Sequence, residues 1–415
     1  MTRREMLTSA VAAARGGATL IERIQRAVIW NGRRGGPTWF HPRATALPSP
    51  RGPRLLMTCQ TISGSDYYGP VHWSESRDLG VTWTEPAPIP GLGRRTHPDG
   101  IEEGVCDVVP EYHPKTGTVL AVGHNVYYKD GKLTRPSEQR WPVYVVRRPD
   151  GSWTRPRRLE WDEPEASALY TCGCSQRINL AGGDILIPLS FGPLGRQDRA
   201  VASVLCTFDG TELRIRRKGN TLRLAAGRGL LEPSLALRRG RYYLTIRAEE
   251  GHGYVATGGD GLEWSQPRPW CWDDGEPLSM STTQQHWLSH SDALFLVYTR
   301  RDATNERVMR WRAPLWVAQM KAAKLALLRD TEQIVFPMVG DGVNDPEGVA
   351  RMGNFHTVAV TEQLSLVTVA EEFPRNQWRG DTLVARVRWK QPNRMGRRLG
   401  YGSSSSSLSM SCGPM

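Results

Sequence analysis

One strand unit recurs six times along this sequence and constrains the fold more than any other feature. Each unit begins with a strand led by polar residues, followed by a tight turn and an apolar strand. The apolar strands contain Leu56, Leu120, Leu186, Leu244, Leu296 and Val367, which lie 52 to 71 residues apart. Compact propeller blades repeat every ~40 to 50 residues, and longer outer loops account for the excess. The recurrence predicts an all-β fold, a six-bladed β-propeller, with seven blades as the alternative.

The two ends of the chain are predicted to close the ring of blades. The last unit, Phe355 to Trp389, supplies three strands. The apolar segment Ala27 to Trp30 is expected to add the fourth, which would leave no open sheet edge. The sequence therefore predicts one β-propeller domain over residues 27–390.

The segments outside this domain have a different composition. Residues 1–26 contain Arg3-Arg4 followed by Ala12 to Ala14, which resembles a twin-arginine export signal and predicts a periplasmic or secreted protein. Residues 391–415 contain a serine run from Ser403 to Ser407 and are predicted to form a disordered tail.

The composition restricts the classes of partner. Gly (42), Pro (29) and Trp (15) residues are plentiful, which favours short strands joined by turns. The net charge of +12 is spread along the chain, whereas a nucleic-acid binder concentrates its charge in a stripe or tail. Such a surface is either simply solvated or attracts acidic ligands. No apolar run approaches the about 18 residues that span a membrane. We therefore expect no nucleic-acid or membrane partner.

The seven cysteines follow no regular spacing, which argues against a disulfide framework. Cys172-Gly173-Cys174 lacks the second cysteine pair of a zinc site. His286 and His290 would lie about 13 Å apart on a strand, too far to share a metal. The acidic loop Asp341 to Asp345 could hold a structural calcium ion, but its spacing fits no standard calcium loop and is typical of a solvated turn. We predict no metal at the site and no required cofactor.

The octapeptide Ser76 to Trp83 reads Ser-x-Asp-x-Gly-x-x-Trp between alternating apolar residues. The Ser and Asp side chains can hold a tight turn, Gly accepts φ > 0, and Trp can lie between neighbouring sheets. A weaker copy occurs at Thr257 to Trp264 and a truncated one at Asp150 to Trp153. The motif resembles the Asp box, or BNR repeat, of sialidase-like β-propellers. We predict that it lies in an outer turn, away from the channel, as part of the scaffold.

The residues that lead the inner strands are expected to converge on one mouth of the central channel. Arginines predominate among the cations there, and a guanidinium fork binds a carboxylate in bidentate fashion. The pattern therefore predicts a site for an acidic ligand. In the alternative interpretation, these residues cap strand ends and bind water in a wet channel. The set consists of His41, Arg43, Asp107, Glu111, Gln176, Arg177, Glu232, Ser234, Gln284, Gln285, His286, Asn354 and His356, with Arg247 and Arg300 on or just after inner strands.

Across residues 27–390 the chain resembles the sialidase-like superfamily. Phe40-His41-Pro42-Arg43 stands where sialidases carry their Arg-Ile-Pro strand, and Asp66 stands where their acid Asp lies. In sialidases three Arg hold the substrate carboxylate, and a Tyr assisted by a Glu is the nucleophile. The chain departs from this pattern in blade six, because Gly353 to Val358 contains no Tyr.

The C-terminal half resembles the propeller enzymes that cleave rhamnosyl-glucuronate linkages, as hydrolases or lyases. This resemblance is stronger than its resemblance to true sialidases. The residues that carry this resemblance are Thr282 to Trp287, His290 to Asp292, Phe295 to Arg301 and Arg312 to Leu315. It implies an exo-acting enzyme that removes a terminal sugar from an acidic oligo- or polysaccharide. The alternatives are an exo-α-sialidase, a non-catalytic glycan-binding propeller and a protein-interaction scaffold.

Roles for individual residues depend on the reaction. Elimination needs Arg to neutralise the uronate carboxylate and a neutral His as base. His286 or His124 is then the base, and Tyr298 or a second histidine, His356, the acid. For hydrolysis the candidates are carboxylates, Asp66, Asp107 and Glu232. The predicted substrate-binding residues are Arg43, Arg177, Glu232, Arg247, Gln285, Arg300 and Asn354.

Overall fold

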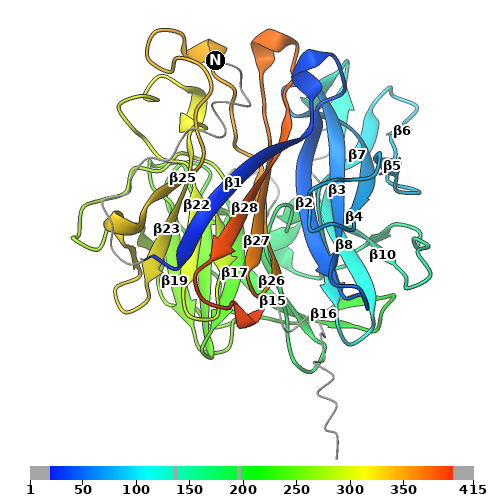
Figure 1. The fold of residues 1–415 in the computed structure, drawn as a ribbon. Helices are drawn as coiled ribbons and strands as arrows, with labels where there is room; N and C mark the ends of the chain where they lie inside the picture. Colours follow the sequence, from blue (N-terminus) through cyan, green and yellow to red (C-terminus); the bar gives the residue numbers. More distant parts are fainter. Residues whose placement is uncertain (1–18, 135–138, 194–197, 396–415) are drawn as a thin grey trace, which may run out of the picture.

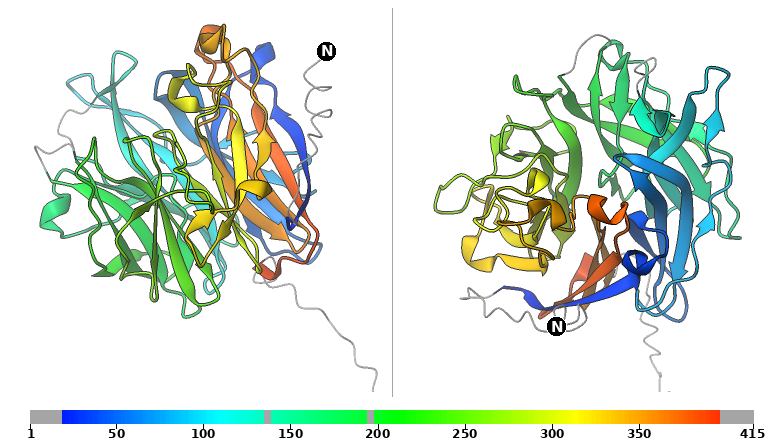
Figure 2. Two further views of the ribbon diagram at one scale, coloured as in Figure 1. Left: turned by 90° about the vertical axis from the view of Figure 1, so that its left-hand side faces the viewer. Right: turned by 90° about the horizontal axis from the view of Figure 1, so that it is seen from above.

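The computed structural model describes residues 19–134, 139–193 and 198–395 and consists of six antiparallel sheets arranged as the blades of a propeller (Figures 1 and 2). Blade one contains β2 (Trp39–Leu47), β3 (Arg54–Gly64), β4 (Tyr67–Ser76) and β5 (Ala87–Pro88). Blade two contains β6 (Arg95–Thr96), β7 (Glu102–His113), β8 (Thr118–Lys129), β9 (Lys132–Thr134), β10 (Pro142–Arg147) and β11 (Arg157–Arg158). Blade three contains β12 (Leu169–Thr171), β13 (Ile178–Asn179), β14 (Ile185–Gly192), β15 (Ala200–Phe208) and β16 (Leu213–Lys218).

The other three blades complete the ring. Blade four contains β17 (Leu231–Arg238), β18 (Arg241–Arg247), β19 (Tyr254–Gly258) and β20 (Arg268–Pro269). Blade five contains β21 (His286–Ser289), β22 (Leu294–Tyr298), β23 (Leu315–Lys321), β24 (Ala326–Leu327) and β25 (Gln333–Phe336). Blade six contains β26 (Phe355–Thr361), β27 (Leu364–Ala370), β28 (Thr382–Trp389) and β1 (Ile21–Trp30). The prediction of six blades is confirmed, and each apolar marker residue lies in the strand that pairs with the inner strand of its blade.

The N-terminal strand closes the ring. β1 pairs antiparallel with β28, with Ala27 opposite Val384 and Val28 opposite Leu383, and forms the outermost strand of blade six (Figure 1). The strand begins at Ile21, earlier than the predicted boundary at residue 27. The Arg3-Arg4 motif lies outside the described residues. Arg26 of β1 also donates hydrogen bonds to the carbonyls of Val335 and Ile334 in β25, so the closing strand is tied to blade five as well.

The first residues of the predicted tail are ordered. Asn393 is fully buried, and its side-chain nitrogen donates to the carbonyl of Ser289 at 2.9 Å. The serine run lies outside the part of the chain that the structure describes. Within that part, the helices are short 3-10 turns, and none is long and apolar enough to cross a membrane: η1 (Gly32–Arg34), η2 (Pro164–Ala166), η3 (Met309–Trp311), η4 (Arg329–Thr331), η5 (Pro346–Gly348) and η6 (Pro374–Asn376).

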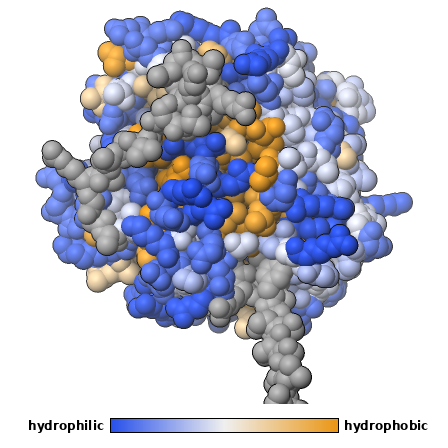
Figure 3. Space-filling model, viewed as in Figure 1, coloured by the Kyte–Doolittle hydropathy of each residue, from blue (hydrophilic) through white to orange (hydrophobic). Residues whose placement is uncertain are grey.

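Apolar side chains pack between neighbouring blades rather than in one central core. Leu186 of blade three and Leu244 of blade four belong to one buried cluster, and Leu55 of blade one and Leu366 of blade six to another. The described cysteines are all free thiols, consistent with the absence of a disulfide framework. The face seen in Figure 3 is largely hydrophilic, with apolar residues gathered near its middle.

The turn at Ser76 to Trp83 is held by its own side chains. The Ser76 hydroxyl donates to Asp78 Oδ1 at 2.8 Å and accepts from Gly80 N at 2.8 Å, while Asp78 also accepts from the backbone of Val81 and Thr82. Gly80 has φ of 80°, which suits glycine. The turn joins β4 to β5, and the turns at residues 150–153 and 257–264 join the corresponding strands of blades two and four. All three lie in the outer part of their blades, as predicted.

Candidate active site

Three inner strands carry a bulge near the end at which they begin. The register shifts between Phe40 and Arg43 in β2, between Cys106 and Val109 in β7, and between Leu231 and Ser234 in β17. Within these bulges His41, Asp107 and Glu232 have φ of 52°, 56° and 43°. Such backbone costs about 1–3 kcal/mol for a non-glycine residue and persists mainly at functional sites. The shared position defines one end of the channel, which we call the mouth.

Asp107 is the half-buried anion of the mouth. Its Oδ1 accepts a short hydrogen bond from Arg43 Nη2 and lies 3.5 Å from His41 Nε2. Burial opposes ionisation, but the His41 and Arg43 charges together lower the pKa of Asp107 below its usual range. Burial lowers the pKa of His41 itself, whereas Arg43 carries its charge at every pH near neutrality and is the partner that keeps Asp107 ionised there.

Glu232 and Arg247 form a second pair at the mouth. Arg247 Nη1 lies 2.6 Å from Glu232 Oε1, and Arg247 Nε donates to Thr282 Oγ1 at 2.9 Å. Burial alone would lower the pKa of Arg247, but the Glu232 carboxylate raises it above its ordinary value. The Glu232 side chain is 34% exposed, so its carboxylate can be reached from solvent.

Asp66 lies at the β3–β4 turn, close to the first bulge. It is exposed, has φ of 52°, and accepts a 2.8 Å hydrogen bond from the Tyr68 hydroxyl. The Tyr68 ring packs against His41 with 4.5 Å between centroids. Burial raises the pKa of Tyr68 well above its usual range, and the Asp66 carboxylate adds to this effect. Tyr68 was not among the sequence candidates, because it lies on the third strand of its blade.

Arg310 and Arg312 come from the connection between β22 and β23 and were not predicted as site residues. Arg312 Nη1 donates to Glu372 Oε2 at 2.9 Å. Arg310 and Trp311 have φ of 53° and 47°. Arg312 packs on Gly353, the residue before Asn354, since a Cβ at Gly353 would lie 2.4 Å from Arg312 Nε. Arg310 is exposed, and its pKa is lowered by the partial burial of its guanidinium and then by the positive charges of Arg312 and Arg247. Among the described residues Arg310 forms no hydrogen bond or ion pair.

A hydrogen-bonded layer lies beneath the mouth. Gln284 Oε1 accepts from Arg43 and contacts His286 Nε2 at 2.9 Å, and Gln284 Nε2 donates to Asn354 Oδ1 at 2.9 Å. His286 is fully buried, and its Nδ1 lies 2.9 Å from Ser234 Oγ. Burial lowers the pKa of His286 well below its usual range. With both ring nitrogens engaged and no exposed surface, His286 is better suited to a structural role than to the predicted role of base.

Arg177 lies at the opposite end of the channel, which corrects the expectation that it joins Arg43. A cavity of about 300 Å³ opens there between the later residues of the inner strands. Arg177 Nε lies 3.3 Å from Glu111 Oε2, and its Nη1 donates to the carbonyl of Val109. His356 lines the same cavity, and burial lowers its pKa to about 3. The His356 ring also lies 5.6 Å, between centroids, from the His286 ring beneath the mouth, so His356 lies between the two ends of the channel.

Three further predicted residues contact partners within or between blades. Tyr298 is fully buried and donates to Glu332 Oε1 at 2.5 Å. Arg300 forms a bidentate pair with the same Glu332 carboxylate. Gln285 Oε1 accepts from Thr245 Oγ1 at 2.6 Å. These contacts hold Tyr298, Arg300 and Gln285 in place, and the catalytic and binding roles predicted for them stay predictions.

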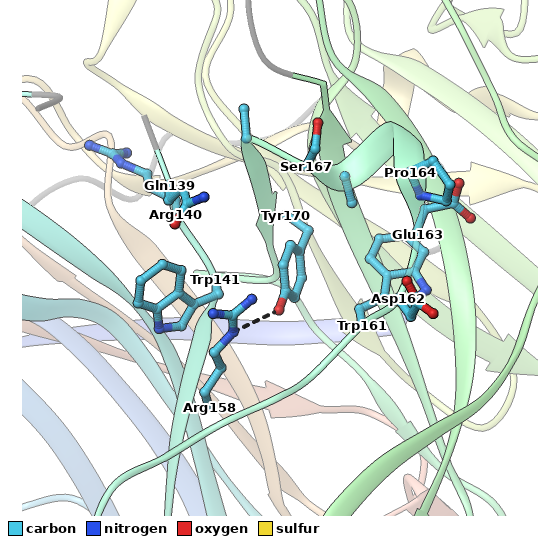
Figure 4. Close-up of a pocket in the computed structure, with 12 residues that line it drawn as sticks. Gln139, Arg140, Trp141, Arg158, Trp161, Asp162, Glu163, Pro164, Ser167 and Tyr170 are labelled. Atoms are coloured by element: carbon cyan, nitrogen blue, oxygen red, sulfur yellow. Dashed lines mark hydrogen bonds between the residues drawn. The ribbon is translucent and has the colours of Figure 1, made fainter. Parts of the chain in front are cut away.

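An aromatic pocket of about 250 Å³ lies beside the mouth, between blades two and three (Figure 4). Trp141, Trp161 and Tyr170 line it, and the Arg158 guanidinium stacks over Trp141 at 4.3 Å while donating to the Tyr170 hydroxyl. Arg140 also lines the pocket, and its charge contributes to lowering the pKa of His124 after the larger effect of burial. Pro142, which follows Trp141, is the cross-strand partner of His124, so the pocket adjoins the end of the channel where His124 lies.

His124, the remaining sequence candidate, lies at the mouth. It is on β8, only 8% exposed, and its Nε2 is 3.3 Å from the Cys106 sulfur of β7. Burial lowers its pKa to about 4, so the ring is neutral near pH 7. The mouth thus brings together Arg43, Asp66, Asp107, His124, Glu232, Arg247 and Asn354 from the predicted set.

The loop Asp341 to Asp345 forms the solvated turn that its spacing suggested. Asp341 Oδ1 accepts from the backbone of Val343 and Asn344, and Oδ2 accepts from the Asn344 side chain at 2.8 Å. The carboxylate is therefore used to hold the turn.

Comparisons with solved structures identify a sialidase-like propeller fold. Trypanosoma rangeli sialidase, solved with the inhibitor DANA, superposes with a TM-score of 0.58 at 12% identity over 84% of this chain, which spans 55% of that protein's length. NanB sialidase from Streptococcus pneumoniae gives 0.58 at 11% identity over 94% of this chain and 72% of that one. A protein of unknown function from Dyadobacter fermentans superposes with a TM-score of 0.61 at 16% identity, over 89% of this chain and 100% of that one. No family model and no curated protein sequence matches the chain.

Proposed function

We propose that the protein is a glycan-cleaving enzyme that acts at the mouth on the terminal sugar of an acidic glycan. The observation that carries this proposal is the cluster of arginines at the mouth, of which Arg310 has no carboxylate partner among the described residues. Arg43 is paired with Asp107, Arg247 with Glu232 and Arg312 with Glu372. A substrate carboxylate would complete this set of ion pairs.

The acid and base groups beside the arginines suit cleavage. Asp66 is exposed and hydrogen-bonded to a protonated phenol, whereas Asp107 is held ionised by Arg43. Two carboxyl groups in such different surroundings suit the acid and the anionic role of a hydrolase. For elimination, Tyr68 would be the proton donor, because burial raises its pKa well above the usual range and keeps the phenol protonated. The non-catalytic alternative predicts arginines without such groups.

A rhamnose–glucuronate linkage is the substrate we propose. Blade six presents Asn354 at the mouth and no tyrosine in Gly353 to Val358, so the nucleophile of a retaining sialidase has no counterpart there. The similarity in fold to sialidases, one solved with sialic acid, supports exo-α-sialidase activity as the second candidate. The large apolar side chains exposed in the described residues, Val28, Val81 and Val343, lie off the inner strands, which disfavours a protein-interaction scaffold.

The aromatic pocket offers a place for a neighbouring sugar of the same glycan. Trp141 and Trp161 provide apolar faces, and Arg140 and Arg158 provide hydrogen-bond donors. A chain held at the mouth and extending toward blades two and three would contact this pocket.

One experiment tests the proposed function. The purified protein is incubated separately with a rhamnose-capped glucuronoglycan and with a sialoside, and both ultraviolet absorbance of unsaturated uronate and released sugars are measured. Unsaturated product indicates a lyase, and free rhamnose without it indicates a hydrolase. Release of sialic acid alone would replace the preferred substrate by the second candidate. Binding of the glycans with no turnover would overturn the enzymatic proposal.

A further inference from the structure

Cys106 and His124 are direct cross-strand partners on β7 and β8, and Asp107 follows Cys106 in the bulge. The Cys106 sulfur lies 3.3 Å from His124 Nε2 and 3.9 Å from Asp107 Oδ2. In the described residues this is the one group of three His, Cys, Asp or Glu side chains whose ligand atoms all lie within 4.8 Å of one another. The two buried members and the half-buried Asp107 bring a sulfur, a nitrogen and an oxygen together.

These separations suit a tetrahedral metal ion. Zinc binds thiolate sulfur at about 2.3 Å and imidazole nitrogen or carboxylate oxygen at about 2.0–2.2 Å, which places neighbouring ligand atoms about 3.5 Å apart. The observed 3.3 and 3.9 Å lie on either side of that value. A mixed sulfur, nitrogen and oxygen set favours zinc-like transition metals over calcium or magnesium, which prefer oxygen.

The two oxygens of Asp107 are divided between different neighbours. Oδ1 accepts from Arg43 and faces His41, whereas Oδ2 faces the Cys106 sulfur. The ion pair with Arg43 therefore leaves one carboxylate oxygen available as a ligand. It also orients that oxygen, as partners of metal ligands commonly do.

The histidine has an incompletely satisfied ring and little space around it. His124 Nδ1 is buried with no hydrogen-bond partner, and its Nε2 faces only the weakly polar Cys106 sulfur. Gly173 packs directly on the ring, since a Cβ at that position would lie 2.1 Å from His124 Nδ1. The ring is thus fixed with Nε2 directed toward Cys106 and Asp107.

We propose that Cys106, Asp107 and His124 bind a zinc-like divalent metal ion in the wall of the mouth. Cys106 binds as the thiolate and releases its proton to solvent, so that the thiolate and the Asp107 carboxylate balance the charge of the ion. The Asp107 side chain is 21% exposed, so a fourth position faces the mouth and accepts water or a sugar oxygen. Only this last role, contact with a sugar, rests on the proposed function.

The test uses Co²⁺ added to the full-length metal-free protein under reducing conditions, without glycan. The expected result is one bound ion per chain with a sulfur-to-cobalt charge-transfer band. C106S and H124Q should each abolish the band. Each should also lower the affinity for Co²⁺ by more than about 100-fold, the upper end of the loss that follows removal of a residue that only supports a ligand. C271S is the matched control and should retain both, because Cys271 is a half-buried thiol in the connection between β20 of blade four and β21 of blade five.

Absence of the band in the wild-type protein, or its persistence in C106S, would overturn the metal site. If C106S does not fold, thermal unfolding of the wild-type protein is the second test. Zn²⁺ should raise the midpoint temperature of unfolding, because a ligand that binds the folded state stabilises it. An unchanged midpoint at saturating Zn²⁺ would contradict the site. Because these measurements need no substrate, metal binding without turnover would refute the proposed function alone, and turnover without metal binding would refute this site alone.

Discussion

At the scale of single residues, the mouth consists of charges fixed in pairs by strained bulges. Arg43 is 1% exposed and depends on Asp107, because an unpaired buried guanidinium is strongly destabilising. Asp107→Asn should lower the free energy of unfolding at pH 7 by roughly 3–5 kcal/mol. Urea titration measures this, with Asp130→Asn in the exposed β8–β9 turn as control.

The same pair predicts a pH dependence. The charges around Asp107 lower its pKa against the effect of burial, so its ionised form stabilises the fold above the unfolded value of about 3.9 and loses that contribution as the pH falls toward the folded value. The difference between wild type and Asp107→Asn should therefore shrink from pH 7 to pH 3. A difference that stays constant over this range would contradict the pairing.

Arg310 is expected to bind the substrate carboxylate. Arg310→Met should raise KM about tenfold or more, since a charge-assisted hydrogen bond contributes about 1.5–3 kcal/mol. Arg301→Met is the matched control, because Arg301 lies in the same connection and pairs only with exposed Glu306. Steady-state kinetics on the acidic glycan measure both, and equal KM values would remove Arg310 from the site.

The sequence located some site residues and misplaced others for a definite reason. Polar residues that lead inner strands reach the mouth when a bulge turns them there, as at Asp107 and Glu232. Arg177 follows the irregular segment of blade three and lies toward the other end. Bulges and the left-handed backbone of Arg310 depend on tertiary contacts, and no local pattern in the sequence specifies them.

At the scale of elements, the outer turns lock neighbouring blades. The Ser76 to Trp83 turn packs on blade six, where a Cβ at Gly80 would come within 2.9 Å of Leu366. Ser76→Ala removes two hydrogen bonds of a buried hydroxyl and should cost about 1–3 kcal/mol of stability. Activity per folded molecule should remain unchanged, because the turn lies far from the mouth. A lower kcat with unchanged stability would contradict this assignment.

The strand pattern was the most predictable part of the fold. The six apolar strands that pair with the inner strands, and the turns in the outer part of the blades, are local signals. Their positions therefore followed from the sequence. The first and last residues of the propeller domain were less predictable. In β1 only Ile21 is fully buried, and charged residues separate it from the next apolar ones. Asn393 is buried by contacts with residues more than a hundred positions away.

At the scale of the whole molecule, the ring depends on its closing strand. Deleting residues 1–30 removes β1, exposes the edge of β28 and breaks the Arg26 hydrogen bonds to blade five. We expect this truncated protein to lose cooperative unfolding and to aggregate, and a synthetic peptide of residues 19–30 to restore part of its stability. Calorimetry with and without the peptide measures this. An unchanged transition after the deletion would show that β1 does not close the ring.

The most direct test of the central claim, that the mouth recognises an acidic sugar through its arginines, compares one glycan in two forms. The rate of terminal-sugar release is measured on the native glucuronoglycan and on the same polymer with its carboxyl groups reduced to alcohols. We predict cleavage of the native polymer and loss of nearly all cleavage after reduction, because Arg310 then has no anion to bind. Equal rates on the two polymers would contradict the account.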